Sequence, residues 1–132
     1  AAAALAACEQ VMQRCDSLGL AGVALAARVR GALFAVRAGA HERALALTRQ
    51  ALDTPADIDA DDLYRGERWR NAVLAFEAAG SIEEARAAAR SGRDWVRRVV
   101  DEQVPAVFRD SFLHRNPVNR ELLALAARLT PR

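Results

Sequence analysis

The feature that most constrains the fold is an internal repeat, because the chain matches itself after a shift of 41 residues. The matched positions are Leu33 with Leu74, Ala38-Gly39 with Ala79-Gly80, Glu42 with Glu83, Ala44 with Ala85, and Arg49 with Arg90. Each copy reads as a helix, an Ala-Gly turn and a second helix that opens with an acidic and then a small residue. Repeated helical units bury their apolar faces by stacking on their neighbours. The repeat therefore predicts stacked antiparallel helical hairpins.

The composition agrees with closely packed helices. Of the 132 residues, 52% are hydrophobic, many of them alanine, whereas only 5% are aromatic. Small apolar side chains let helices approach one another and suit wide β-sheets poorly. The charged share of 27% and the mean hydropathy of -0.06 argue against a disordered chain and against a membrane bundle. We therefore expect a soluble, all-α chain.

Helical periodicity, interrupted by Gly and Pro, divides the chain into about six to seven helices within one domain. We expect a leading helix at 1–18, repeat one at 23–52, repeat two at 62–104 and a C-terminal capping segment at 105–132. Repeat one contains helices at about 23–38 and 41–52, and repeat two has its first helix at about 62–79. Its second helix starts at the S-x-x-E capping box of Ser81 and Glu84. The last helix covers about 118–129 and follows Asn116-Pro117.

The two copies resemble tetratricopeptide repeats, a family of stacked helical hairpins. In that family a small residue of the first helix faces an alanine of the second. Ala32 and Ala44 take these positions in copy one, and Ala85 takes the alanine position in copy two. Trp69 and Phe76 match the aromatic positions of copy two. The resemblance implies an α-solenoid fragment whose helix pairs close on small residues.

The resemblance covers about residues 23–100 and includes departures from the family pattern. Arg28 and Ala35 replace the aromatic residues in copy one, and Val73 replaces the usual small residue in copy two. The shift exceeds the family's period of about 34 residues because an acidic loop is inserted. The segment from Phe108 to Leu129 resembles the closing segment of large bacterial transcriptional activators and signalling ATPases. That resemblance implies upstream DNA-binding and nucleotide-binding domains.

In tetratricopeptide arrays the first helices line a concave groove, which provides candidate partner-binding residues. Copy one would present Ala26, Val29, Leu33, Val36 and Arg37, and copy two would present Glu67, Arg70, Leu74 and Glu77. The apolar set of copy one calls for a cover, because such patches seldom stay exposed. The cover is residues 1–18, an upstream repeat, a second copy of the chain or a partner helix. The mixed-charge set of copy two suits a reversible contact, since Arg70 can bind a carboxylate through two hydrogen bonds.

The acidic loop begins like a calcium-binding loop, with Asp57, Asp59, Asp61 and Asp62. An EF-hand needs Gly at the sixth position and a bidentate Glu at the twelfth, where this chain has Asp62 and Arg68. We therefore expect no metal here, but a solvated loop whose last aspartates cap the next helix.

A row of arginines is expected on one face of the second helix of repeat two: Arg86, Arg90, Arg93 and Arg97. Such a row could bind phosphate or an acidic partner. No aromatic residue is interleaved with it, and the formal net charge of the chain is only +2. We expect a hydrated face with Glu83, Asp94 and Asp101 as local partners, and no nucleic-acid binding.

Catalysis and metal binding find little support. His41 and His114 do not form a metal-binding pair, and Asp110, Ser111 and His114 lack the G-x-S-x-G turn that exposes a nucleophile. We expect no enzyme, no cofactor and no metal.

The two cysteines and the first residues bear on location. Cys8 and Cys15 would lie about 10 Å apart along one helix, beyond the reach of a disulfide. Free thiols favour the cytoplasm. The opening residues lack the basic flank of a signal peptide, and no stretch has the length of a membrane span.

The sequence thus predicts a non-enzymatic helical-repeat domain for protein interaction, the C-terminal fragment of a bacterial transcriptional regulator. Its partner would be a protein or peptide, the upstream repeats of the same chain, or a second copy of the chain. The alternative is a small-effector-sensing domain of the same kind of regulator. That alternative calls for a deep pocket flanked by Trp69, Phe76 and Trp95 in place of a packed aromatic core.

Overall fold

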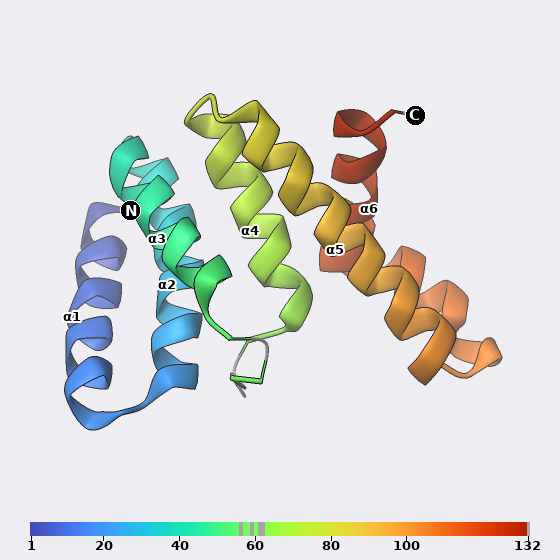
Figure 1. The fold of residues 1–132 in the computed structure, drawn as a ribbon, viewed down its shortest axis with the longest axis horizontal. Coiled ribbons are helices and arrows are strands. Elements are labelled where there is room, and N and C mark those ends of the chain that lie inside the picture. The colour runs from blue at the N-terminus through green and yellow to red at the C-terminus, as the bar shows by residue number, and fades with distance from the viewer. Residues whose placement is uncertain (56, 59, 61–62, 132) are drawn as a thin grey trace.

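The computed structural model describes residues 1–55, 57, 58, 60 and 63–131. Every regular element in these residues is helical, so the expectation of an all-α chain is confirmed (Figure 1). The elements are α1 (Ala2–Leu18), α2 (Ala21–Arg37), α3 (His41–Asp53), α4 (Arg65–Ala78), α5 (Ile82–Gln103), the short segments η1 (Ala106–Phe108) and η2 (Ser111–Arg115), and α6 (Pro117–Leu129).

Three helix-to-helix turns share one backbone geometry. Gly19, Gly39 and Gly80 have φ of 70°, 74° and 77°, the left-handed region that glycine enters without the steric penalty of a Cβ. The residue after each glycine donates its backbone N–H to a carbonyl near the end of the preceding helix, in three bonds of 2.8–3.0 Å: Leu20 to Cys15, Ala40 to Ala35, and Ser81 to Phe76. The turn at Gly19 extends to α1 and α2 a feature that the repeat showed only for Gly39 and Gly80.

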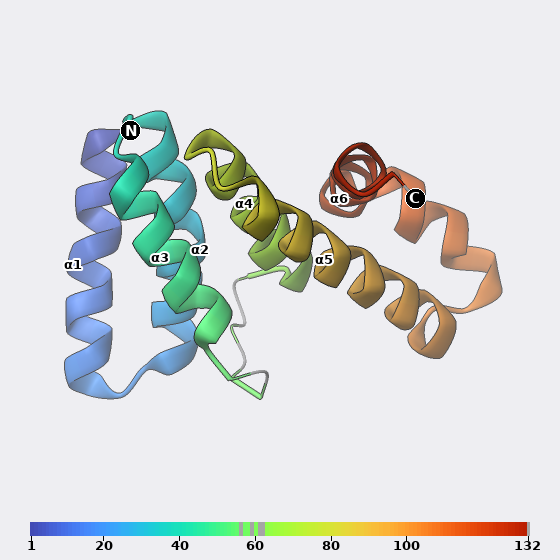
Figure 2. The same cartoon turned by 45° about the horizontal axis from the view of Figure 1, so that its top comes forward.

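The helices pack both with their neighbours in sequence and with alternate helices. α1, α3 and α4 all contact α2, and α4 in turn contacts α5 and α6. The two views agree that the helices lie in a row from α1 to α6, with the N-terminus at one end and the C-terminal segment at the other (Figures 1 and 2). The contacts of α2 with α4 and of α4 with α6 hold successive hairpins together.

Alanine fills several of the buried contacts between helices. Ala32 and Ala44 are buried in one cluster with Ala75 of α4, so α2, α3 and α4 meet there. Ala85 is buried with Phe76 and with residues of α6. Between α2 and α4, the buried Asn71 donates its side-chain amide to the Val29 carbonyl oxygen at 3.1 Å.

Ion pairs also join alternate helices. Glu9 of α1 pairs with Arg43 of α3 at 2.6 Å. Arg49 of α3 pairs with Glu84 of α5 at 2.6 Å. Such partly exposed pairs each contribute at most about 1 kcal/mol, so they orient the helices more than they hold them together.

α4 begins at Arg65, not at position 62 as the sequence suggested. Tyr64 is extended, with φ -67° and ψ 128°, and makes no side-chain capping bond. The chain stays extended here because Leu63 is buried against Leu25 and Val29 of α2. The expected caps Asp61 and Asp62, and Asp59 of the acidic loop, lie outside the described residues, whereas Asp57 is exposed.

Candidate functional site

The structure divides the candidate residues of copy one between core and surface. Val29 is only 2% exposed and packs with Leu25, Ala26, Ala51 and Leu63. It cannot line a groove open to a partner, which corrects the expectation for Val29, whereas Ala26 is 7% exposed and lines a surface cavity between α1 and α2. The sequence could not reveal this, because Leu63 reaches α2 from a loop more than thirty positions further along the chain.

The remaining residues of copy one lie nearer the surface. Val36 is half-buried and packs against a cluster that includes Leu5, Cys8 and Met12 of α1. The helix at 2–18 therefore covers part of the apolar face, which is one of the four covers considered. Leu33 is half-buried and Arg37 is exposed at the end of α2.

The charged residues of copy two join α4 to its neighbouring helices. Arg70 lies 3.9 Å from Glu67 and 3.6 Å from Glu121 of α6. Glu67 also lies 3.8 Å from Arg30 of α2. These charges already have partners within the chain, so Arg70 does not offer an unoccupied guanidinium to a carboxylate.

Two further residues of copy two, Glu77 and Leu74, also contact other residues of the chain. Glu77 accepts two hydrogen bonds of 2.9 and 2.8 Å from Arg128 of α6, and these bonds lower the pKa of its carboxyl group. Leu74 is half-buried and packs against the cluster around Phe76. We use the name even-helix face for the set of Leu33 and Arg37 on α2 with Glu67, Arg70, Leu74 and Glu77 on α4.

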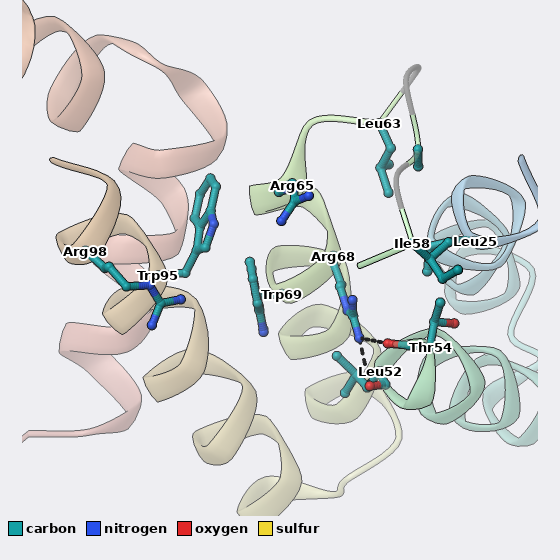
Figure 3. A pocket seen from close by; sticks show the side chains of 11 residues that line it. Leu25, Leu52, Thr54, Ile58, Leu63, Arg65, Arg68, Trp69, Trp95 and Arg98 are labelled. Carbon is teal, nitrogen blue, oxygen red and sulfur yellow. Dashed lines mark hydrogen bonds between the residues drawn. The ribbon is translucent and has the colours of Figure 1, made fainter. Parts of the chain in front are cut away.

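A pocket of about 370 Å³ lies between α2, α3, α4 and α5 (Figure 3). Trp69 and Trp95 form part of its wall, as the effector-sensing alternative expected, together with Arg65, Arg68 and Arg98. The other described residues around it are Leu25, Leu52, Thr54, Ile58, Ala60 and Leu63. No acidic side chain is among the described lining residues.

Phe76 does not belong to this pocket, which corrects that part of the expectation. It is 2% exposed and buried with Ala72, Val73 and Ala85. Phe76 follows Trp69 by seven residues, so it lies about 10 Å further along α4, where α5 and α6 enclose it.

Sequence reasoning missed the arginines of the pocket, although their spacing offers a signal. Arg65, Arg68 and Trp69 are at positions i, i+3 and i+4 of α4, and Trp95 and Arg98 are at i and i+3 of α5. Residues at this spacing share a helix face. Each helix therefore presents arginine and tryptophan together, and the antiparallel hairpin brings the two sets to one place.

The aromatic wall is held in place by ring contacts. The ring centroids of Trp69 and Trp95 lie 5.4 Å apart, and Tyr64 meets Trp95 edge to face at 5.8 Å. Tyr64 donates its hydroxyl hydrogen to Asn119 of α6 at 2.9 Å. Burial raises the pKa of Tyr64 above its usual range.

Arg68 holds the end of α3 beside the pocket. Its Nη2 donates to the carbonyl oxygens of Leu52 at 2.8 Å and of Thr54 at 2.9 Å, at the C-terminal end of α3, where carbonyls lack helical partners (Figure 3). Its Nε is buried and has no hydrogen-bond partner in the part of the chain described. Burial, and secondly the charge of Arg65, lower the pKa of Arg68. The charged side chains among the described lining residues of the pocket are all arginines.

The arginine row of α5 is less uniform than expected. Arg86 pairs with Glu83 at 2.5 Å and also donates to the Leu129 carbonyl oxygen at 3.2 Å. Arg93 lies 3.5 Å from Asp94 and is half-buried against the end of α6. Arg90 and Arg97 are exposed, so only part of the row forms a hydrated face.

The other reactive groups are scattered. Cys8 is half-buried and Cys15 is buried, both are free thiols, and burial raises the pKa of Cys8. His41 and His114 are exposed. Among the residues that the structure describes, no group of three or more His, Cys, Asp or Glu could hold a metal ion.

Two further findings concern the possibility of a membrane span and the similarity of the chain to known proteins. None of the helices in the described residues is both long enough and apolar enough to cross a membrane. Comparison of the chain with protein-family models, with curated proteins and with solved structures found no match.

Proposed function

We propose that the chain is a tetratricopeptide-like array of helical hairpins that acts as a non-enzymatic protein-interaction domain. One observation carries the proposal: the same left-handed glycine turn joins α1 to α2, α2 to α3 and α4 to α5. The contacts of α2 with α4 and of α4 with α6 support it, because stacked arrays are held together between successive repeats.

The partner surface in this proposal is the even-helix face. On α2 it consists of Leu33, which is half-buried, and Arg37, which is exposed. Its mixture of half-buried leucines and charges suits a protein, a peptide, an upstream repeat or a second copy of the chain. In the same proposal the chain is the C-terminal part of a cytoplasmic bacterial transcriptional regulator, on the resemblance of residues 108–129.

Analytical ultracentrifugation over a range of concentrations tests this surface with the variant Leu33→Glu. Val107→Glu in η1 is the matched control, since Val107 is 80% exposed and lies away from α2. We expect the wild type and the control to associate with rising concentration and Leu33→Glu to remain monomeric. If the wild type and Leu33→Glu are both monomeric and equally stable, the Leu33 face is neither an interface between copies nor covered core.

The pocket favours a second candidate function, the sensing of a small effector. A volume of about 370 Å³ lies within the range of small-molecule sites. Trp69 and Trp95, two of the three aromatic residues that this function calls for, line the pocket, and Trp95 also packs in a buried cluster with Val96 and Leu122. In this candidate, the ligand would contact four helices from two hairpins and so affect how the hairpins stack.

A further inference from the structure

We infer that the pocket between α2, α3, α4 and α5 binds a small ligand that joins an anionic group to a flat apolar group, as in an aryl carboxylate or an aryl phosphate. The inference rests on the second candidate function, small-effector sensing, and is independent of the interaction surface. It names the ligand chemistry that the lining side chains recognise.

The charged side chains among the described lining residues favour an anionic group on the ligand. Arg65, Arg68 and Arg98 contribute three guanidinium groups, and the described lining residues contribute no carboxylate. Guanidinium groups bind carboxylate and phosphate through paired, charge-assisted hydrogen bonds. The pocket also lies beside the first turn of α4, where the helix dipole adds positive potential.

The arginines of the pocket differ in the contacts that they make within the chain. Arg68 caps α3 with Nη2, whereas its buried Nε has no partner among the described residues. Arg98 is exposed at the pocket, with no ion pair in the described part of the chain. The two bonds to α3 account for the position of the Arg68 side chain without a ligand. No such bond of Arg98 is found in the described part of the chain, although Arg98 lines the same pocket as two further arginines. Burial first, and the charge of Arg65 second, lower the pKa of Arg68, and a bound anion would offset the second of these effects.

The walls select an apolar, planar group. Trp69 and Trp95 present indole rings whose positions are fixed by contact with each other and with Tyr64. Leu25 and Leu52 complete the apolar part of the lining. In the view of Figure 3, Trp69 stands between Arg68 on one side and Trp95 and Arg98 on the other. A ligand beside Trp69 would therefore meet an aromatic face and a guanidinium together.

The only two tryptophans of the chain both line the pocket, so intrinsic tryptophan fluorescence reports on this site. We would titrate the 132-residue chain with phenylpropionate, phenyl phosphate, neutral phenylpropanol and inorganic phosphate. Phenyl rings do not absorb at the red edge of tryptophan absorption, so the emission change measures binding. We expect at least one aryl anion to bind about tenfold more tightly than phenylpropanol and than inorganic phosphate, since each lacks one half of the recognised chemistry.

Arg98→Gln and Arg97→Gln form a matched pair, because both remove one exposed arginine charge from α5 and only Arg98 lines the pocket. We expect Arg98→Gln to weaken aryl-anion binding about tenfold and Arg97→Gln to leave it unchanged. Thermal unfolding of both variants should match the wild type, which excludes misfolding as the cause. The relative affinity of the two aryl anions identifies the preferred headgroup.

Each of three results would overturn the inference. If phenylpropanol binds as tightly as the aryl anions, the pocket is a small-molecule site without anion preference, and only effector sensing survives. If no aryl probe changes the tryptophan emission, or if the two arginine variants behave alike, the site is not the one described. The proposal for the even-helix face is unaffected by any of these results, because sedimentation of Leu33→Glu tests it separately.

Discussion

At the scale of single residues, glycine has opposite roles at different positions of this chain. At Gly39 and Gly80 the backbone requires glycine, because φ is positive there. Crowding does not require it, because an added Cβ would meet no atom within 4 Å. Gly92 is required by its surroundings, since an added Cβ would lie 2.8 Å from Leu122 and from the Cβ of Trp69. The close approach of α5 to α4 and α6 therefore depends on Gly92, which the sequence shows only as an interruption within a helix.

Gly92→Ala should destabilise the protein by about 1 to 2 kcal/mol, because overpacking against α4 and α6 exceeds the gain in helix propensity. Gly31→Ala is the matched control in the interior of α2. Its added Cβ would be 3.4 Å from Cys8 and Leu47, an ordinary contact, so we expect a change between neutral and about 1 kcal/mol of added stability. Urea unfolding of both variants checks the pair. Equal effects of the two substitutions would show that Gly92 does not mark a close helix contact.

At the scale of elements, the start of α5 shows what a motif does and does not predict. Ser81 is the N-cap of α5 and Ile82 its first residue, so the capping box located the helix start correctly. The bonds differ, because Ser81 donates its hydroxyl to Glu84 at 2.8 Å and makes no side-chain capping bond. Glu84 is drawn away by Arg49 of α3, which donates two hydrogen bonds of 3.0 and 2.6 Å. A tertiary partner thus overrides a local motif.

The pair of Arg49 and Glu84 makes stability depend on pH. Hydrogen bonds from Arg49 and then from Ser81 lower the pKa of Glu84 below its ordinary value of 4.5. Because the pKa is lower in the folded than in the unfolded state, this stabilisation is present above pH 4.5 and is lost as the pH falls through the folded-state value.

Glu84→Gln should therefore lower the free energy of unfolding slightly at neutral pH and leave it unchanged in acid. Urea unfolding at both pH values measures this difference. Glu102→Gln is the control, as Glu102 is exposed at the end of α5. The effect is small because the pair is largely solvated. A loss of stability that is the same at both pH values would mean that the charge of Glu84 does not interact with Arg49.

At the scale of the whole molecule, periodicity and turn residues predicted the helices, because both are local properties of the chain. The bounds of α1, α2 and α3 agree with the expected ranges to within two residues. The site was less predictable, because it depends on contacts between distant segments. Val29 is buried by Leu63, and the pocket joins arginines and tryptophans of α4 and α5 to leucines of α2 and α3.

The contact of α2 with α4 distinguishes stacked hairpins from hairpins that are merely joined in sequence. Nuclear Overhauser effects between methyl groups test it directly, because Ala32 of α2 and Ala75 of α4 belong to one buried cluster. If the hairpins stack, we expect cross-peaks between these two methyl groups, and between the side-chain amide of Asn71 and residues around Val29. Cross-peaks confined to the pairs α2–α3 and α4–α5, with none between α2 and α4, would contradict it.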